Sequence, residues 1–224
     1  MQLSALKTNV LLLYLIGVIA LGLFFFVPAG TIDYWQAWVY LFILFVPAFF
    51  VSSYFLGRDP KFLERRMKMK EKEIEQKLIV KLSGVIFLIG FLIPGFDRRF
   101  GWSSIPSEFV LVAEAFVVIG YILIFLVFKE NHYASRTVEV EKGQKVIITG
   151  PYSIVRHPMY VGVLVMFLAT PIALGSYFAL PIFLLMIPLL VYRIFNEEKI
   201  LLRDLAGYKK FCQKTRYRLI PFIW

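Results

Sequence analysis

The sequence has few of the residues that disulfides, metal sites and nucleotide-binding loops need. Cys212 is the only cysteine, which excludes a disulfide within the chain, and no Cys/His grouping has the spacing of metal ligands. No serine lies on a nucleophile elbow, and no glycine-rich loop follows a strand pattern. We therefore expect neither a bound metal nor Ser/His/Asp hydrolysis. A Rossmann site and a P-loop are excluded as well, so any nucleotide-like cofactor must be held by helix ends and side chains.

Acidic residues are scarce too. The chain has 15 Asp and Glu against 25 Lys and Arg, giving a formal net charge of +10. Such a surplus can indicate nucleic-acid binding, but the rest of the composition points elsewhere. Hydrophobic residues make up 59% of the 224 positions, 23 of them phenylalanine, and the mean hydropathy is +0.73. Long apolar runs of this kind are typical of a polytopic helical membrane protein.

We expect an all-α integral membrane protein with about six membrane helices and a C-terminal amphipathic cytoplasmic helix. Val10–Ala29 is too long for a signal-peptide core, so it is predicted to be a true span. Residues 1–128 form the predicted N-terminal membrane part, and residues 129–224 form the predicted catalytic region. The predicted spans are Val10–Ala29, Tyr34–Gly57, Leu78–Phe96 and Phe109–Phe128, followed by a hairpin of two short helices within Met159–Tyr192.

The distribution of basic residues predicts the orientation. With both termini on one side, all but two of the 25 Lys and Arg lie on that side, which the positive-inside rule makes cytoplasmic. The basic surplus is therefore explained by membrane topology, and we expect the lipid bilayer as partner and no nucleic acid. Residues 58–77, rich in Lys and Arg, read either as an interfacial helix on an anionic leaflet or as a solvated basic linker.

The run Met159–Tyr192 contains no Asp, Glu, Lys or Arg and is too long for one crossing, which needs about 20 residues. Pro171, Gly175-Ser176, Pro181 and Pro188 interrupt it, so we expect a helical hairpin with its tip near Gly175. Both ends then emerge on the same side of the membrane. Whether these short arms cross the whole bilayer is left open by the sequence.

Two segments outside the membrane have patterns of their own. Val138–Glu141 and Lys145–Ile148 flank the turn signal Lys142-Gly143-Gln144, which predicts a small β-hairpin. Glu197–Tyr217 places apolar residues on one helical face, which predicts one amphipathic helix lying over the mouth of the membrane hairpin.

The polar residues at the two ends of the hairpin carry the functional hypothesis. Pro158 suits the first position of a helix, and Arg156 and His157 then lie beside the free N–H groups of that helix end. Glu197 and Glu198 follow the second arm. A hairpin brings these groups to one surface, where the basic end favours a carboxylate or phosphate. The acidic end favours an ammonium, a sulfonium or ribose hydroxyls. A lipid acceptor could enter from the bilayer and a water-soluble donor from the cytosol.

These motifs resemble a known family. The sequence Gly150-Pro-Tyr-Ser-Ile-Val-Arg-His-Pro-Met-Tyr-Val-Gly162, followed by Glu197-Glu198-x-x-Leu201 and Gly207-Tyr208, is similar to isoprenylcysteine carboxyl methyltransferases and their phospholipid-methyltransferase relatives. The resemblance covers residues 129–224. It implies S-adenosylmethionine as methyl donor, with S-adenosylhomocysteine as product. The cofactor residues that it implies are Tyr152, His157, Pro158, Tyr160, Gly162, Glu197, Glu198, Leu201 and Tyr208.

The resemblance also implies roles. Arg156 is similar to the arginine that orients the acceptor carboxylate in the carboxyl methyltransferases. A carboxylate needs no deprotonation at neutral pH, whereas an amine does, and His157 or Glu197 could then serve as the base. The predicted catalytic residues are therefore Arg156, His157 and Glu197. The predicted substrate residues are Arg156, Arg218 and, from the polar loop before the hairpin, Asn131 and Arg136.

Two other functions remain open at this point. The segment Tyr208–Pro221 also resembles the C-terminus of membrane sterol reductases, which share an Arg-His-Pro-x-Tyr motif and use NADPH. The paired Glu197-Glu198 favours the methyltransferases. A non-catalytic membrane scaffold is the third possibility. The acceptor, which could be a prenylated cysteine, a lipid amine, an isoprenoid or a hydrophobic acid, is not identified by the sequence.

Overall fold

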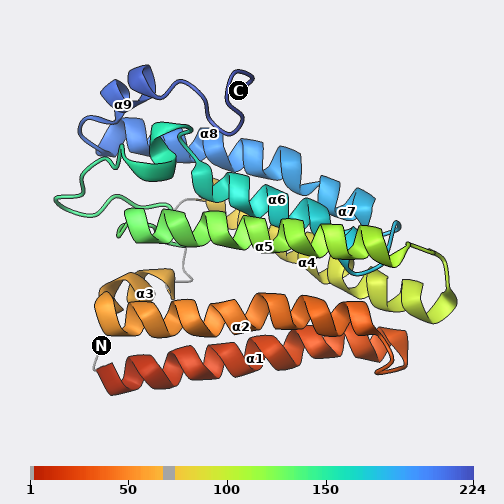
Figure 1. The fold of residues 1–224 in the computed structure, drawn as a ribbon. Helices are drawn as coiled ribbons and strands as arrows, with labels where there is room; N and C mark the ends of the chain where they lie inside the picture. The colour runs from red at the N-terminus through yellow and green to blue at the C-terminus, as the bar shows by residue number, and fades with distance from the viewer. Residues whose placement is uncertain (1–2, 68–73) are drawn as a thin grey trace.

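The computed structural model describes residues 3–67 and 74–224, and within them the chain is helical with no strand. Figure 1 shows long helices that run roughly side by side, with the N-terminus and α9 near the same end. The elements in chain order are α1 (Leu3–Ala29), α2 (Trp35–Arg58), α3 (Pro60–Arg66), α4 (Ile74–Phe100), α5 (Ser107–Glu130), the short 3₁₀-helix η1 (Gly150–Ser153), α6 (Pro158–Ala173), α7 (Leu180–Leu184), α8 (Met186–Asp204) and α9 (Tyr208–Lys214).

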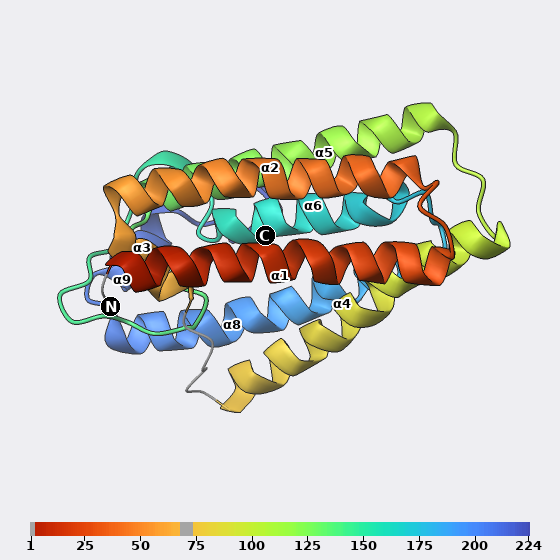
Figure 2. The ribbon, with the colours of Figure 1, turned by 90° about the horizontal axis from the view of Figure 1, so that it is seen from below.

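In the described part of the chain, five helical segments are long and apolar enough to cross a membrane: α1, α2, α4, α5 and the continuous stretch Leu180–Asp204. Their outward faces carry exposed leucine, isoleucine and phenylalanine, which suits contact with lipid. Figure 2 shows α1, α2, α5, α6 and α8 lying along a similar direction, with α4 crossing obliquely. The predicted all-α membrane protein is confirmed. Because α6 has only 16 residues, its crossing of the bilayer stays a prediction.

Aromatic rings fill the core of the helix bundle. Phe91 of α4 packs edge-on against Phe25 of α1 and Phe183 of α7, with ring centroids 5.8 and 5.5 Å apart. Such pairs add to the stabilisation that burial of the rings already gives. On another face, α5 packs along α6, so the two predicted parts of the chain, 1–128 and 129–224, share one interface. The hairpin that carries the polar motifs is thereby fixed between α4 and α5.

The hairpin turns at Gly175, as predicted, and Gly175 adopts the left-handed φ of 74°. Buried Asp97 at the end of α4 secures this turn. Its carboxylate accepts hydrogen bonds from Ser176 Oγ at 2.5 Å and from Ser103 N and Oγ, both at 2.7 Å. The three contacts tie α4, the loop before α5 and the hairpin tip together at the end of the bundle opposite α9.

Replacing Asp97 by alanine is expected to lower the free energy of unfolding by roughly 3 kcal/mol, because it leaves buried hydroxyl and N–H donors without an acceptor. Thermal unfolding in detergent measures the change. Asp33→Ala is the matched control, since the Asp33 side chain is 89% exposed and lies 3.5 Å from Arg98; its effect should stay below about 1 kcal/mol. Equal unfolding temperatures for the two variants would contradict the role assigned to Asp97.

The predicted single helix Glu197–Tyr217 is wrong. Helix α8 continues through Glu197 and Glu198 to Asp204, and the chain breaks at Leu205–Gly207 before α9 begins. Gly207 has a φ of 88°, a conformation that a helix cannot contain. The break lets Leu205, Tyr208 and Phe211 pack together in one apolar cluster. Glu197 and Glu198 therefore lie inside α8.

The predicted β-hairpin in residues 138–148 is also wrong. Its turn forms, with Gly143 at a φ of 81° and Gln144 N donating to Glu141 O at 3.0 Å, but no strand pairing follows. The flanking residues are used for other contacts. Arg65 of α3 donates to Glu141 Oε1 at 2.9 Å, and Val140 and Val146 pack against the apolar cluster at α9. Contacts with α3 and with the apolar cluster at α9 thus take the place of cross-strand hydrogen bonds.

The basic segment 58–77 contains α3, which begins at Pro60 and is capped by Asp59 Oδ1 accepting from Phe62 N at 3.1 Å. Phe62 is buried against Phe55, with ring centroids 4.4 Å apart. The apolar side of α3 therefore packs on the protein. Residues 68–73, on which part of the interfacial-helix prediction depends, lie outside the described residues.

Candidate active site

The motif Arg156-His157-Pro158 lies where α6 begins. His157 is the N-cap residue and Pro158 occupies the first helical turn, as predicted. The backbone of the motif is held from the other side. Arg156 N donates to Tyr217 O at 2.9 Å, and His157 N donates to Arg218 O at 3.0 Å. These two bonds orient the motif, and the side chains of Arg156 and His157 reach the acidic residues of α8.

Glu198 of α8 contacts three basic residues, Arg156, His157 and Arg218. Its Oε1 lies 3.0 Å from Arg156 Nε and 3.2 Å from His157 Nε2, and its Oε2 accepts a hydrogen bond from Arg218 Nε at 2.9 Å. The expected meeting of the basic and acidic groups is present. The Glu198 side chain is only 8% exposed, so the pairing is well shielded from water. Buried charges need such partners, and removing one partner leaves another charge uncompensated.

Glu197 has different surroundings, although it is the adjacent residue. Tyr160 OH donates to Glu197 Oε2 at 2.5 Å, and Arg193 Nε donates to Tyr160 OH at 2.9 Å. His157 Nδ1 lies 4.0 Å from Glu197 Oε1. The Glu197 side chain is 23% exposed and lines a cavity. This carboxylate is therefore oriented by a neighbour and also accessible to a ligand.

Arg193 was missed in the sequence. It lies one helical turn before Glu197 on α8, a spacing at which side chains meet, and this spacing is the signal that could have found it. Besides binding Tyr160, its Nη2 donates to Arg136 O at 3.0 Å. Arg66 of α3 donates to the adjacent carbonyl, Ser135 O, at 3.1 Å. Burial and the neighbouring Arg136 and Arg193 lower the pKa of Arg66 to about 10. Arginines of α3 and α8 thus hold the loop that walls the cavity.

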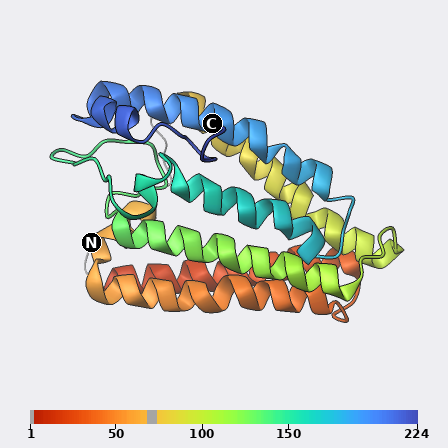
Figure 3. The same ribbon diagram turned by 45° about the horizontal axis from the view of Figure 1, so that its top comes forward.

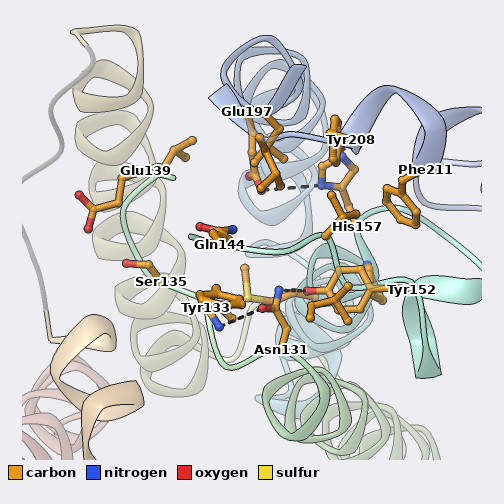
Figure 4. A pocket seen from close by; sticks show the side chains of 18 of the residues that line it. Asn131, Tyr133, Ser135, Glu139, Gln144, Tyr152, His157, Glu197, Tyr208 and Phe211 are labelled. Carbon is orange, nitrogen blue, oxygen red and sulfur yellow. Dashed lines mark hydrogen bonds and ion pairs between the residues drawn. The ribbon is translucent and has the colours of Figure 1, made fainter. Parts of the chain in front are cut away.

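The cavity lies between α8, α9, η1, the start of α6 and the loop after α5, and it encloses about 870 Å³ of space, part of it open to solvent. Figure 4 shows side chains from these elements converging on it, with Glu197, His157 and Tyr208 on one side and Asn131 and Tyr152 on the other. Leu201, Leu205 and Phe211 supply an apolar wall. A cleft that combines an apolar wall with convergent polar groups is typical of a site for a small organic ligand.

Two tyrosines bring hydroxyl groups to this cavity. Tyr208 is buried, and its hydroxyl has no hydrogen-bond partner among the residues that the structure describes. Burial raises the pKa of Tyr208, and the charges of Glu198 and Glu197 raise it further. Tyr152 OH accepts from Asn131 Nδ2 at 2.8 Å, and burial raises the pKa of Tyr152 to about 12. Both hydroxyls remain protonated at neutral pH, and the Tyr208 hydroxyl can donate to a ligand.

A comparison with known families gives a match for the segment that forms most of this cavity. Residues 109–206 match the family model of the phospholipid methyltransferases. The resemblance inferred from the sequence is confirmed over this segment, which runs from α5 to the end of α8 and contains Arg156, His157, Glu197 and Glu198. The segment is therefore similar to membrane methyltransferases.

A second comparison concerns the reductases. The Delta(14)-sterol reductase TM7SF2 of Mus musculus is 32% identical to this chain over 91 residues, which cover 39% of this chain and 22% of that protein. The chain therefore spans about a fifth of the length of this curated relative.

Some of the predicted site residues line the cavity and others lie outside its lining. Asn131 is the predicted substrate residue that lines the cavity, whereas Arg136, Arg156 and Arg218 do not. Arg136 offers its carbonyl to Arg193, and the other two pair with Glu198. The predicted cofactor residues that line the cavity are Tyr152, His157, Pro158, Tyr160, Glu197, Leu201 and Tyr208. Glu198 and Gly162 do not belong to the lining.

Gly162 faces α5 and does not line the cavity, although the resemblance places it in the cofactor site. A Cβ atom built on Gly162 would lie 2.8 Å from both Gly120 O and Ile124 Cγ1. Small residues let two membrane helices approach at such places. Gly162→Ala is therefore expected to cost about 1–3 kcal/mol of stability through overpacking, measured by thermal unfolding in detergent.

The matched control is Gly84→Ala in α4, where nothing lies within 4 Å of the added Cβ. This control should keep the unfolding temperature or raise it, because alanine favours a helix more than glycine does. If Gly162→Ala keeps its stability but loses affinity for the cofactor, Gly162 belongs to the cofactor site and not to the packing of α6 on α5.

Proposed function

We propose that this protein transfers a methyl group from S-adenosylmethionine to a lipophilic acceptor, either the carboxylate of an isoprenylcysteine-like molecule or a lipid amine. The observation that carries the proposal is the cavity itself. It places His157, at the start of α6, and Glu197, on α8, around one ligand-sized space. The family match supports membrane methyltransferase activity for the segment that forms most of this cavity.

The residues of the cavity fit this cofactor. The Tyr208 hydroxyl is a buried donor without a partner among the described residues, as expected of a group that binds a ligand. Leu201, Leu205 and Phe211 would hold the adenine against an apolar surface, and Glu197 would lie near the cationic or hydroxyl groups. When bound, S-adenosylmethionine supplies a methyl group on a sulfonium, which an acceptor nucleophile can take.

Glu197 is the better of the two predicted bases. His157 Nε2 is engaged with Glu198, whereas the Glu197 carboxylate lines the cavity and is partly exposed. Tyr160 and Arg193 hold the carboxylate in place, so an ammonium group of the acceptor can lose its proton to it. A carboxylate acceptor needs no such step, and the residues then act by positioning and by excluding water.

Arg156 has a changed role in this proposal. The sequence suggested that it orients the acceptor carboxylate, but the side chain is buried and pairs with Glu198 outside the cavity lining. We assign it to positioning Glu198 and, through it, the His157 ring. Asn131 remains the predicted acceptor-side residue that lies at the cavity.

A second function is favoured by one observation. The chain is 32% identical over 91 residues to a sterol reductase, and a nicotinamide-dependent lipid or sterol reduction would use the same cavity. Binding of S-adenosylhomocysteine and of NADPH to the detergent-purified protein, measured by isothermal calorimetry, distinguishes the two. S-adenosylhomocysteine binding together with lipid products that gain one methyl supports the methyltransferase. Binding of NADPH alone supports the reductase, and binding of neither supports a scaffold.

We also propose that the cavity faces the cytoplasm, because the Lys and Arg residues gather at its end of the bundle. Cys212, the single cysteine, lies on α9 at this end and is partly exposed. A membrane-impermeant maleimide should label it in inside-out vesicles and leave it unlabelled in intact cells. The reverse pattern would overturn the orientation.

A further inference from the structure

The loop at residues 217–224 presents apolar side chains outward. Phe222 is 87% exposed, Ile223 77% and Ile220 52%. The loop is compact, since Trp224 O accepts hydrogen bonds from Arg218 N at 2.8 Å and Leu219 N at 3.0 Å. Phe222 has a φ of 67°, a left-handed conformation that non-glycine residues rarely adopt. A closed loop of this kind holds its apolar tip away from the rest of the chain.

The loop lies at the border between the apolar and polar parts of α8. Figures 1 and 3 show the chain after α9 running back alongside α8. Trp224 packs edge-on against Phe195, with ring centroids 5.7 Å apart, and Phe195 comes two residues before Glu197. Phe195 is 43% exposed and belongs to the outward apolar side of α8. The apolar tip is thus continuous with a surface that faces lipid.

The surroundings of the tip have the chemistry of a membrane interface. Tyr217 packs against Phe222 with centroids 5.3 Å apart, and tyrosine and tryptophan are enriched at the level of lipid headgroups. Four basic residues in and just after α9 are exposed close by in sequence and complement an anionic leaflet; they are Lys209, Lys210, Lys214 and Arg216.

The same loop also holds the candidate active site. The carbonyls of Tyr217 and Arg218 accept from the backbone N–H groups of Arg156 and His157, and the Arg218 side chain binds Glu198. Leu219 is buried beside Tyr160. Residues 220–224 are therefore linked to the start of α6 and to Glu198 through Arg218, whose backbone N–H donates to Trp224 O.

We infer that Ile220, Phe222 and Ile223 insert into the lipid leaflet at the basic end of the bundle, and that this insertion holds the cofactor site in its binding-competent arrangement. The bilayer then surrounds the membrane helices and also controls whether the site can bind its cofactor. The first half of the inference is independent of the enzymatic reaction, whereas the second half rests on the proposed function.

Insertion is tested with the full chain in lipid nanodiscs that contain phosphatidylglycerol. An environment-sensitive fluorophore is attached to Phe222→Cys in a Cys212→Ser background. We expect quenching by lipids that carry a spin label just below the headgroup. Lys142→Cys, on the exposed turn next to Gly143, is the matched position and should not be quenched. Absence of quenching at position 222 overturns the insertion, whatever the protein catalyses.

The coupling is tested by the affinity for S-adenosylhomocysteine in the same nanodiscs. The double variant Phe222→Ser with Ile223→Ser should bind roughly 10-fold more weakly, within the usual range of coupling between two sites. Phe222→Trp with Ile223→Leu keeps the apolar tip and should bind like the wild type. Ile32→Ser, at an exposed apolar position of the opposite turn, is the control. Unchanged affinity in the double serine variant overturns the coupling alone. A wild type that fails to bind overturns the proposed function together with the coupling that rests on it, and leaves the insertion to its own test.

Discussion

Replacing Glu198 by alanine is expected to abolish measurable S-adenosylhomocysteine binding and to destabilise the protein by about 3–5 kcal/mol, because Arg156 and Arg218 are left as charges without a counterion in a shielded site. Glu198 lies on α8 and holds groups from two other segments, Arg156 and His157 at the start of α6 and Arg218 in the loop after α9. Losing it should release His157 from its fixed orientation at the cavity. Calorimetric titration and thermal unfolding in detergent measure the two effects separately.

The matched control for this experiment is Asp204→Ala. Asp204 is a carboxylate of the same helix that pairs with its neighbour Arg203 at 2.8 Å on the exposed side. We expect this variant to bind S-adenosylhomocysteine like the wild type. A Glu198→Ala protein that folds and binds as tightly as the control would show that the charge cluster has no part in forming the site.

With an amine acceptor, Glu197→Gln is expected to lower kcat by about 10²–10⁴, the usual contribution of a positioned general base. Glutamine keeps the size of the side chain and can still accept from Tyr160, so the fold and the shape of the cavity should be retained. Affinity for S-adenosylhomocysteine should therefore change little. Single-turnover methyl transfer, followed by mass spectrometry of the lipid product, measures the loss.

The control for Glu197→Gln is methylation of a carboxylate acceptor by the same variant. A carboxylate acceptor is already deprotonated at neutral pH, and its methylation should fall by less than about tenfold in the same variant. An amine acceptor that is methylated at the wild-type rate by Glu197→Gln would remove Glu197 as the base. The comparison also separates O-methylation from N-methylation, which the sequence leaves open.

The sequence does not predict which of the two glutamates, Glu197 or Glu198, faces the cavity. Adjacent residues on a helix point about 100° apart, so Glu197 and Glu198 face different surroundings on α8. The sequence placed both in the cofactor site, whereas the structure gives Glu197 to the cavity and Glu198 to the buried cluster. Which of the two faces the cavity depends on how α8 is rotated against α6, and this rotation is set by packing.

Other differences have the same origin. Residues 138–148 carry a β-hairpin pattern, but Arg65 and the apolar residues near α9 take up the partners that strands would need. Gly162 is part of the family-like motif, yet its position on α6 turns it toward Gly120 of α5. Arg193 directly follows the apolar run and becomes important only because Tyr160 lies beside it.

The sequence by itself determined the membrane helices, the hairpin with its turn at Gly175, Pro158 at the start of α6 and the presence of opposite charges at the two ends of that hairpin. These features follow from the hydropathy and from proline and glycine, which act on the chain locally. Only the tertiary structure decided which side chains share the cavity, which are buried as ion pairs and where the loop at residues 217–224 presents its apolar tip. These depend on contacts between residues far apart in the chain, and periodicity within one element carries no information about them.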